Sequence, residues 1–335
     1  MLKATRPVYY PALLILLFSA WVQTGMAKDY YVSPAGSDRN PGTLEHPLET
    51  IAAAQGKVRQ DSALGKQPIT VHLREGTYYL SEAIVFTHRD SGTESAPVTY
   101  RAYGNEAAVL SGGARLELDW QPYRDGIMQA HVETEHDIDQ LFINGELQRM
   151  ARYPNYNPEN KTAPYRGYAA DAFSREKAGQ WAEPKGGYMH VMHRRGWGGH
   201  HYRITGKNAD GELTYVGGWQ NNRPQGMHPE HRMVENIFEE LDTPHEWYYD
   251  DKAQILYYMP PAGLDLQRAR VEIVLLPHLV VFQGEYAGTR EIGIRGKMRT
   301  FQHGIKDPVR HITLKGLEMT QTARTFMQND EPLLR

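Results

Sequence analysis

The chain has 335 residues, with 37 Lys and Arg against 40 Asp and Glu, which gives a formal net charge of −3 at pH 7. This balance gives no support to a nucleic-acid partner, because binding to that polyanion usually requires a strong basic excess. The chain contains no cysteine, which excludes disulfide bonds, a thiol nucleophile and thiolate metal ligands.

The first residues have the layout of a secretory signal peptide. Lys3 and Arg6 precede an apolar run from Ala12 to Val22, and the small residues Gly25 and Ala27 follow it. A bilayer span needs about 20 apolar residues, so this run is too short to anchor the chain. We therefore expect an exported protein, periplasmic or extracellular, with residues 1–27 removed and no membrane contact afterwards.

The next segment, residues 28–116, predicts a small cap followed by short strands. Thr50 has the character of a helix N-cap, and Ile51, Ala54 and Val58 follow at helical spacing. From residue 69 the apolar period changes to two, and similar strands return at residues 69–73, 84–86, 98–102 and around 109. Their spacing of 25 to 29 residues suits the stacked coils of a solenoid.

The repeat is interrupted in residues 117–267, which are rich in hairpin signals. Asn144-Gly145 lies between two apolar runs, as does Asp210-Gly211, and both dipeptides favour tight antiparallel turns. A third hairpin is expected from residues 246–249 through the turn 250–252 into residues 255–258. We interpret this region as an inserted antiparallel β domain.

The solenoid period is expected to return in residues 268–335, with strands at 271–275, 279–282, 312–314 and 316–319. The fold class predicted is all-β, with an incomplete right-handed parallel β-helix, the inserted domain and a short capping helix. Only 14 residues follow residue 321, with no amphipathic capping pattern, so the solenoid is expected to be truncated at its C-terminal end. The alternative is that residues 322–335 fold back as a cap.

Several segments carry a family resemblance. It rests on residues 30–43, 90–104, 141–155, 235–236 and 246–261. Together they resemble the parallel β-helix glycoside hydrolases around family 141, in the pectate-lyase-like superfamily. The resemblance implies a polysaccharide substrate of plant or algal origin and an activity of the fucosidase or xylanase kind. It also implies catalytic carboxylates on later coils, so no catalytic residue is transferred to this chain.

The residues themselves also leave the catalytic pair unknown. Glycoside hydrolysis usually needs two carboxyl groups about 5 to 9.5 Å apart. The outward positions assigned on the coils, Glu272 and Glu318 among them, form no obvious acid pair. Glu235 belongs to an acidic run that is more typical of a solvated face than of a catalytic centre. We therefore expect the chain to have little or no activity alone.

A sugar-facing edge is expected near residues 192–202. This run combines aromatic rings, on which sugars stack, with His, Arg and Asn donors for hydroxyl groups. The alternative is that its tryptophans are core residues of the inserted domain. The candidate substrate-binding residues are Arg194, Trp197, His200, His201, Trp219 and Glu235.

No metal or cofactor is predicted. A zinc site formed by His193, His200 and His201 is disfavoured, because adjacent residues on a strand point to opposite faces. The partner expected is a polysaccharide or oligosaccharide, and the oligomeric state is left open. Two other functions remain: a non-catalytic carbohydrate-binding fragment, and a calcium-dependent polysaccharide lyase, which needs a carboxylate cluster that the coils do not offer.

Overall fold

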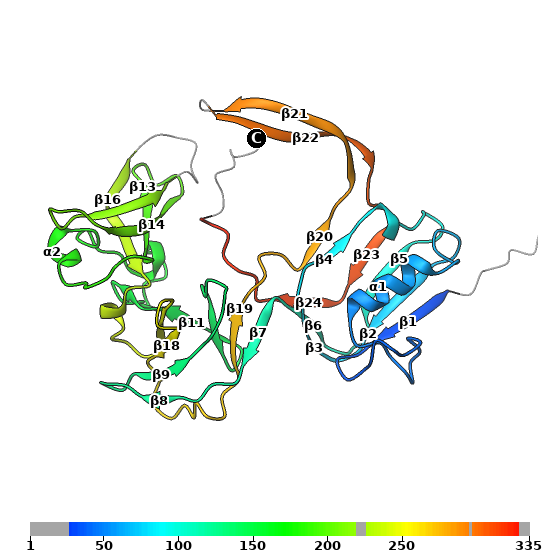
Figure 1. Ribbon diagram of the computed structural model, residues 1–335, viewed down its shortest axis with the longest axis horizontal. Coiled ribbons are helices and arrows are strands. Elements are labelled where there is room, and N and C mark those ends of the chain that lie inside the picture. The colour runs from blue at the N-terminus through cyan, green and yellow to red at the C-terminus, as the bar shows by residue number, and fades with distance from the viewer. Residues whose placement is uncertain (1–26, 219–225, 295–296, 328–335) are drawn as a thin grey trace, which may run out of the picture.

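The computed structural model describes residues 27–218, 226–294 and 297–327, and most of its elements are β-strands (Figure 1). The all-β class predicted from the sequence is confirmed. Within these ranges the helical elements are short: α1 (Ile51–Gln60), α2 (Arg175–Ala178), η1 (His88–Asp90), η2 (Pro164–Arg166) and η3 (Phe238–Glu240). No helix in the described part of the chain is long and apolar enough to cross a membrane. The predicted signal peptide lies outside the described residues except for Ala27.

Three stacks of parallel strands form one half of the molecule. The first stack has the order β1 (Lys28–Val32), β2 (Ile69–Leu73), β5 (Val98–Ala102), β23 (Ile312–Lys315). The second has the order β24 (Leu317–Thr320), β6 (Ala108–Ser111), β3 (Gly76–Tyr79), and the third pairs β20 (Val280–Phe282) with β4 (Ile84–Phe86). All of these pairings are parallel. The chain thus visits the stacks in turn, as expected when parallel neighbours must be joined by crossovers.

The pairing of β23 with β5 joins segments from the two ends of the chain. Ile312 is in register with Val98, and Leu314 with Tyr100. The prediction that strands on either side of the insertion pair in parallel is therefore confirmed. Alternation explains the choice of face, because every second side chain of β2 and β5 is buried while the intervening ones are partly exposed.

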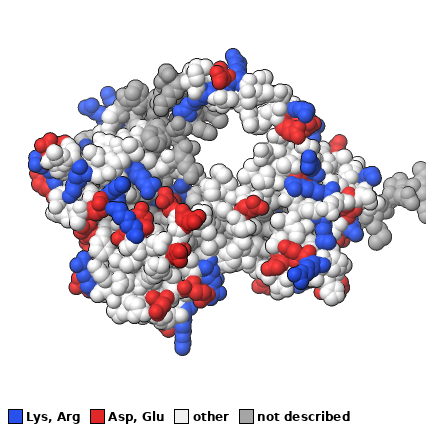
Figure 2. Space-filling model, viewed as in Figure 1, with Lys and Arg blue, Asp and Glu red and all other residues white. Residues whose placement is uncertain are grey.

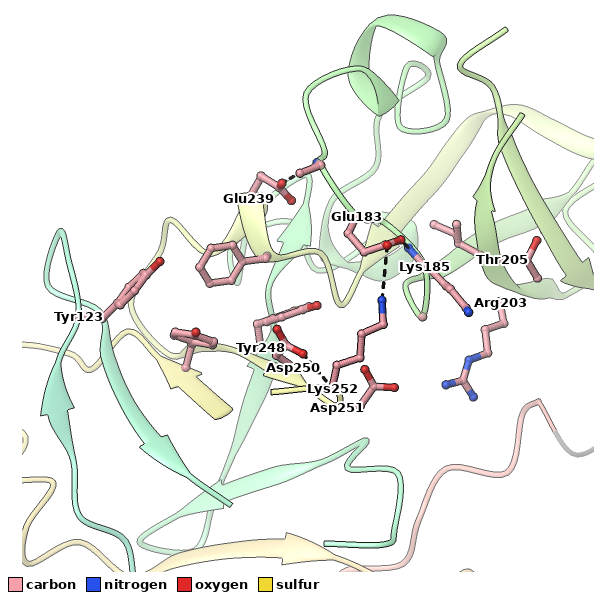
Figure 3. A pocket seen from close by; sticks show the side chains of 15 residues that line it. Tyr123, Glu183, Lys185, Arg203, Thr205, Glu239, Tyr248, Asp250, Asp251 and Lys252 are labelled. Carbon is pink, nitrogen blue, oxygen red and sulfur yellow. Dashed lines mark hydrogen bonds and ion pairs between the residues drawn. The ribbon is translucent and has the colours of Figure 1, made fainter. Parts of the chain in front are cut away.

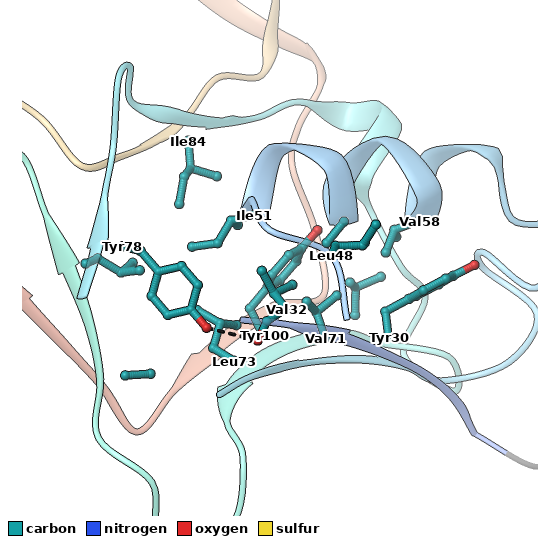
Figure 4. Packing of buried hydrophobic residues seen from close by; sticks show 14 of the residues in the cluster. Tyr30, Val32, Leu48, Ile51, Val58, Val71, Leu73, Tyr78, Ile84 and Tyr100 are labelled. Atoms are coloured by element: carbon teal, nitrogen blue, oxygen red, sulfur yellow. Dashed lines mark hydrogen bonds between the residues drawn. The ribbon is translucent and has the colours of Figure 1, made fainter. Parts of the chain in front are cut away.

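The core of these stacks is closed on one side by α1 (Figure 4). Ile51, Ala54 and Val58 are buried against the strands, as their helical spacing predicts. The Oγ1 of Thr50 accepts a hydrogen bond of 3.1 Å from the backbone N–H of Ala53, so Thr50 is the N-cap. The hydroxyl of Tyr78 donates to the carbonyl of Val32 at 2.9 Å, which satisfies its polar end inside the core.

A second sheet, mostly antiparallel, follows the stacks. Its order is β7 (Gly113–Leu116), β19 (Val271–Val274), β10 (Leu141–Ile143), β11 (Glu146–Met150), β17 (Glu246–Asp250), β18 (Ile255–Tyr258), β9 (Met128–His131), β8 (Gln121–Pro122). The predicted hairpin at Asn144-Gly145 joins β10 to β11, and both turn residues have positive φ, of 53° and 84°. The hairpin of β17 and β18 is confirmed as well.

The prediction for residues 271–275 was wrong, because β19 is not a solenoid strand. Its Val271 pairs with Leu116 of β7 and with Ile143 of β10, both antiparallel. All four residues of β19 are buried, so its continuous apolar run could not distinguish the two kinds of sheet. Glu272, expected to point outward, is 3% exposed and is paired with Arg270 at 3.1 Å.

A third sheet has the order β12 (Arg152–Tyr153), β16 (Met227–Glu235), β13 (Tyr188–His193), β14 (Gly199–Lys207), β15 (Leu213–Gly217). All of its pairs are antiparallel, and the predicted hairpin at Asp210-Gly211 joins β14 to β15. Met189, Ile204 and Val234 pack with the buried Trp181 on one side of this sheet. The other side carries the polar cluster described below.

The last large feature is a long two-stranded ribbon that the sequence did not predict. Strands β21 (Glu285–Ile294) and β22 (Lys297–Asp307) pair only with each other and leave the stacks between β20 and β23. Figure 2 shows an opening between the two halves of the molecule beneath this ribbon, and charges of both signs are interspersed on the face shown.

Candidate functional site

Three strands of the third sheet bring polar side chains together. His190 lies on β13 and is the register partner of His201 on β14, while Glu235 ends β16 on the other side of β13. His190 and Glu235 are buried, at 5% and 8% exposure. Two of the six residues predicted from the sequence, His201 and Glu235, thus meet through a histidine that the prediction did not include.

The cluster is linked by short polar contacts. His190 Nε2 lies 3.0 Å from Glu235 Oε1, and its Nδ1 lies 2.6 Å from His201 Nδ1. Arg324, from the segment that follows β24, donates from Nη1 to the same Glu235 oxygen at 2.6 Å. Arg324 also donates from Nε to Asp139 Oδ2 at 3.3 Å. These contacts leave Glu235 Oε2 without a hydrogen-bond partner among the described residues.

The charges around Glu235 keep its carboxylate ionised. Burial alone raises the pKa of a carboxyl group, but His190 and Arg324 outweigh this effect and hold the pKa of Glu235 well below its usual range. Burial and the neighbouring His190 lower the pKa of His201 to about 4, so this ring is neutral at pH 7. The cluster therefore presents a fixed, buried negative charge.

A pocket of about 550 Å³ opens beside this charge. Its wall includes Glu235, Asp139 and Arg324 from the cluster, together with Arg149, Arg152 and Tyr156 from the segment around β11 and β12. The guanidinium of Arg149 lies 3.8 Å from the ring centre of Tyr156. Three guanidinium groups, two carboxylates and an aromatic ring therefore line one cavity, a combination suited to a hydroxyl-rich or acidic ligand.

A second buried carboxyl group lies behind the pocket. Glu246 is 1% exposed, and burial, with the nearby charge of Asp242, raises its pKa to about 8. The positive charge of Arg152 acts on both Glu235 and Glu246. Glu246 is absent from the pocket lining, so its proton is not in contact with the cavity.

The other predicted site residues lie elsewhere. Arg194 and Trp197 are exposed, with 57% of Trp197 open to solvent, and His200 is buried. The ring of His193 stacks on Trp197 at 5.8 Å and on His200 at 5.6 Å. His200 and His201 belong to different clusters, so the three-histidine zinc site is not assembled. Trp219 lies outside the described residues.

Another pocket, of about 360 Å³, lies between the second and third sheets (Figure 3). Tyr123, Tyr248, Tyr257 and Phe238 form one wall, with ring centres of neighbouring pairs 5.0 to 6.1 Å apart. Charged groups line the opposite side, where Lys252 is paired with Glu183 at 3.5 Å. Sequence analysis did not anticipate this pocket, because its residues come from five separate segments.

Sequence reasoning also missed most of the first pocket. His190 stands alone between Met189 and Val191, and no short motif marks it. Arg324 follows the last predicted strand in a segment without periodicity. Arg152 was within a segment that carried the family resemblance, which was the available signal. No group of three or more His, Asp or Glu side chains placed to hold a metal ion occurs in the described ranges.

Comparison with known proteins gives two curated relatives and one solved structure of interest. The chain is 28% identical to pectate lyase PEL9 of Emericella nidulans over 249 residues, which cover 70% of this chain and 53% of that protein. It is 41% identical to the uncharacterized protein YwoF of Bacillus subtilis over 111 residues, 33% of this chain and 20% of that protein. A solved glycoside hydrolase superposes with a TM-score of 0.68 at 23% identity, over 89% of this chain and 51% of that one.

The chain is therefore similar to a pectate lyase and shares the fold of a glycoside hydrolase. It spans about half the length of PEL9 and of the solved hydrolase. No protein-family model matches it.

Proposed function

We propose that the chain is the sugar-binding part of an exported, polysaccharide-acting enzyme of the glycoside hydrolase kind. In this proposal the three parallel stacks are coils of a right-handed parallel β-helix, the hand that parallel crossovers almost always take. Residues 117–267 are the inserted domain, and residues 1–27 direct export. The fold shared with a glycoside hydrolase and the similarity to a pectate lyase support a polysaccharide ligand.

The observation that carries the proposal is the ionised Glu235 at the wall of the 550 Å³ pocket. Its Oε1 is engaged by His190 and Arg324, which leaves Oε2 to accept hydrogen bonds from sugar hydroxyls. A carboxylate already held by charged donors needs no reorganisation when the ligand arrives. The site can therefore orient a sugar ring.

Cleavage is not expected from this pocket alone. Hydrolysis needs a protonated carboxyl group at the glycosidic oxygen as well as an ionised partner. Glu246 is protonated at neutral pH but does not line the pocket. The proposed role of Glu235 is therefore substrate binding, and the catalytic carboxyl groups remain unassigned.

The exposed face of Trp197, with Arg194 and His200 nearby, is proposed as a further contact for the polymer. Rings that remain open to solvent can stack on the apolar faces of sugars. Trp219 is retained as a proposed binding residue on sequence grounds.

A second candidate function is a polysaccharide lyase, favoured by the similarity to PEL9. A lyase eliminates the leaving sugar and creates an unsaturated product that absorbs in the ultraviolet. A hydrolase instead adds water and produces no such absorbance. The two candidates are therefore separable by the chemistry of their products.

The test is calorimetric titration of the full chain with oligosaccharides from xylan, fucosylated glycans and pectate. We expect binding to one of these classes, a substantial loss of affinity in Glu235→Gln and in Tyr156→Ala, and no release of reducing ends. Arg268→Gln is the control, since this arginine is 89% exposed and lies outside the pocket. Absence of binding to every class would contradict the proposal, and ultraviolet-absorbing products would favour the lyase.

A further inference from the structure

The guanidinium of Arg149 differs from the two other arginines in the 550 Å³ pocket. Its carbon lies 3.8 Å from the ring centre of Tyr156, and among the described residues it makes no hydrogen bond or ion pair. The side chain is half-buried and lines the cavity. A stacked guanidinium keeps its N–H groups in the ring plane, where they remain available to an acceptor.

The other two arginines are already engaged. Arg152 donates to the carbonyls of Pro154, Tyr165 and Gly167 at 2.8, 3.0 and 3.2 Å. Arg324 is occupied by Glu235 and Asp139. Neither has a full set of donors left for a ligand, so Arg149 is the arginine that is free to recognise one.

The charge of the pocket is also unbalanced. Its wall carries three guanidinium groups and two carboxylates, Glu235 and Asp139. Arg324 contacts both carboxylates directly, whereas Arg149 contacts neither. One positive charge therefore remains without an anion, in a concave site where its interaction with a ligand is stronger than in open water.

A planar guanidinium edge matches a carboxylate, because two parallel N–H groups can donate to its two oxygens. The same cavity offers Glu235 Oε2 as an acceptor for hydroxyl groups. A ligand that satisfies both sides must carry hydroxyl groups and one negative charge. Uronic acids are the sugars that combine these groups in a single ring.

We propose that Arg149 binds the carboxylate of a uronic acid residue in the ligand, with Glu235 accepting from the hydroxyls of the same or the adjoining sugar. This inference rests on the proposed polysaccharide function and deepens it. The pocket then selects acidic chains over neutral ones. Tyr156 acts as a positioning residue that holds the guanidinium plane.

The experiment compares an oligogalacturonate with the same oligosaccharide after reduction of its carboxyl groups, titrated against the full chain. A charge-assisted pair is worth about 1.5–3 kcal/mol, so we expect the reduced ligand to bind roughly tenfold to hundredfold more weakly. Arg149→Gln should lose the same factor for the acidic ligand and leave the affinity for the reduced one unchanged. Arg149→Lys keeps the charge but not the planar pair of donors, and should fall between them.

Two further arms sharpen the outcome. Affinity for the acidic ligand should fall with added salt in the native chain, and this slope should decrease in Arg149→Gln. A sulfated neutral oligosaccharide tests whether any anion suffices, and equal binding of this ligand would overturn the assignment to a carboxylate. Arg268→Gln, far from the pocket, should behave like the native chain in every titration.

The result that overturns the inference is equal affinity for the acidic and the reduced oligosaccharide, with no effect of Arg149→Gln. In that case the proposed polysaccharide function survives, because the neutral ligand still binds. If neither ligand nor any other glycan binds, both the inference and the proposed function fail. Thermal melting of each variant establishes that the affinities are compared between folded proteins.

Discussion

Arg324 Nη1 lies 2.6 Å from Glu235 Oε1 and thereby joins the segment that follows the parallel stacks to the third sheet. The two residues are 89 positions apart. The carboxylate is buried, and its neighbouring cation comes from a segment with little other regular structure. This ion pair is therefore both part of the candidate site and a fastening between the halves of the molecule.

Replacing Arg324 by methionine is expected to destabilise the fold. The change leaves Glu235 buried with only His190 as a partner, and breaking a buried pair costs about 3–5 kcal/mol. Urea unfolding should show this loss at pH 7. The double variant Arg324→Met with Glu235→Gln should recover part of it, because no uncompensated charge is left. A single variant as stable as the native chain would contradict the placement of this pair.

The variant Glu246→Gln should change how stability depends on pH. The pKa of Glu246 is raised from 4.5 to about 8, so the folded protein holds a proton that the unfolded chain releases above pH 4.5. Stability should therefore fall as the pH rises from 4.5 to 8, and this fall should be smaller in Glu246→Gln. Melting temperatures measured across this range check the prediction. A variant with the same slope as the native chain would show that Glu246 is not the group responsible.

Alanine at Gly112 should destabilise the junction where the chain leaves the parallel stacks. A Cβ at this position would lie 2.6 Å from the carbonyl oxygen of Gln321, which is backbone and cannot move aside easily. The N–H groups of Leu275 and Leu276 also bind the Gly112 carbonyl, at 2.9 and 3.0 Å. We expect a loss of about 1–3 kcal/mol in urea unfolding. Gly126→Ala is a comparison for added bulk, since its Cβ would meet no atom within 4 Å.

Deletion of the β21–β22 ribbon should be tolerated. The ribbon pairs only with itself, and its apolar side chains are largely exposed, including Met298 at 66% and Ile305 at 72%. Its ends lie close together, since a Cβ at Gly284 would be 3.1 Å from the Asp307 carbonyl oxygen. Replacing residues 285–307 by a short glycine linker should change the melting temperature little. A large loss of stability would show that the ribbon supports the parallel stacks.

The extent to which sequence predicted the fold depended on how local the signal was. The N-cap at Thr50 and the turn at Asn144-Gly145 were predictable because a few adjacent residues determine them. The alternation in β2 and β5 revealed strands with one buried face, and their regular return revealed the parallel stacking.

Features that depend on distant partners were missed or misassigned. The strand β19 is buried on both faces, so its residues carried no sign of an antiparallel partner. The candidate pocket was predicted only through Glu235 and His201, because Arg324 reaches it from a segment far along the chain. The predicted boundaries of the inserted domain, and its sugar-binding edge around Trp197, stay predictions.

The measurement that tests the central claim most directly is a crystal structure of the full chain with an acidic oligosaccharide bound. The account predicts a sugar ring in the pocket between β11 and β16, with its carboxylate at the Arg149 guanidinium and a hydroxyl group at Glu235 Oε2. A sugar found instead against the aromatic wall of Tyr123 and Tyr257, with the Arg149 pocket empty, would contradict it.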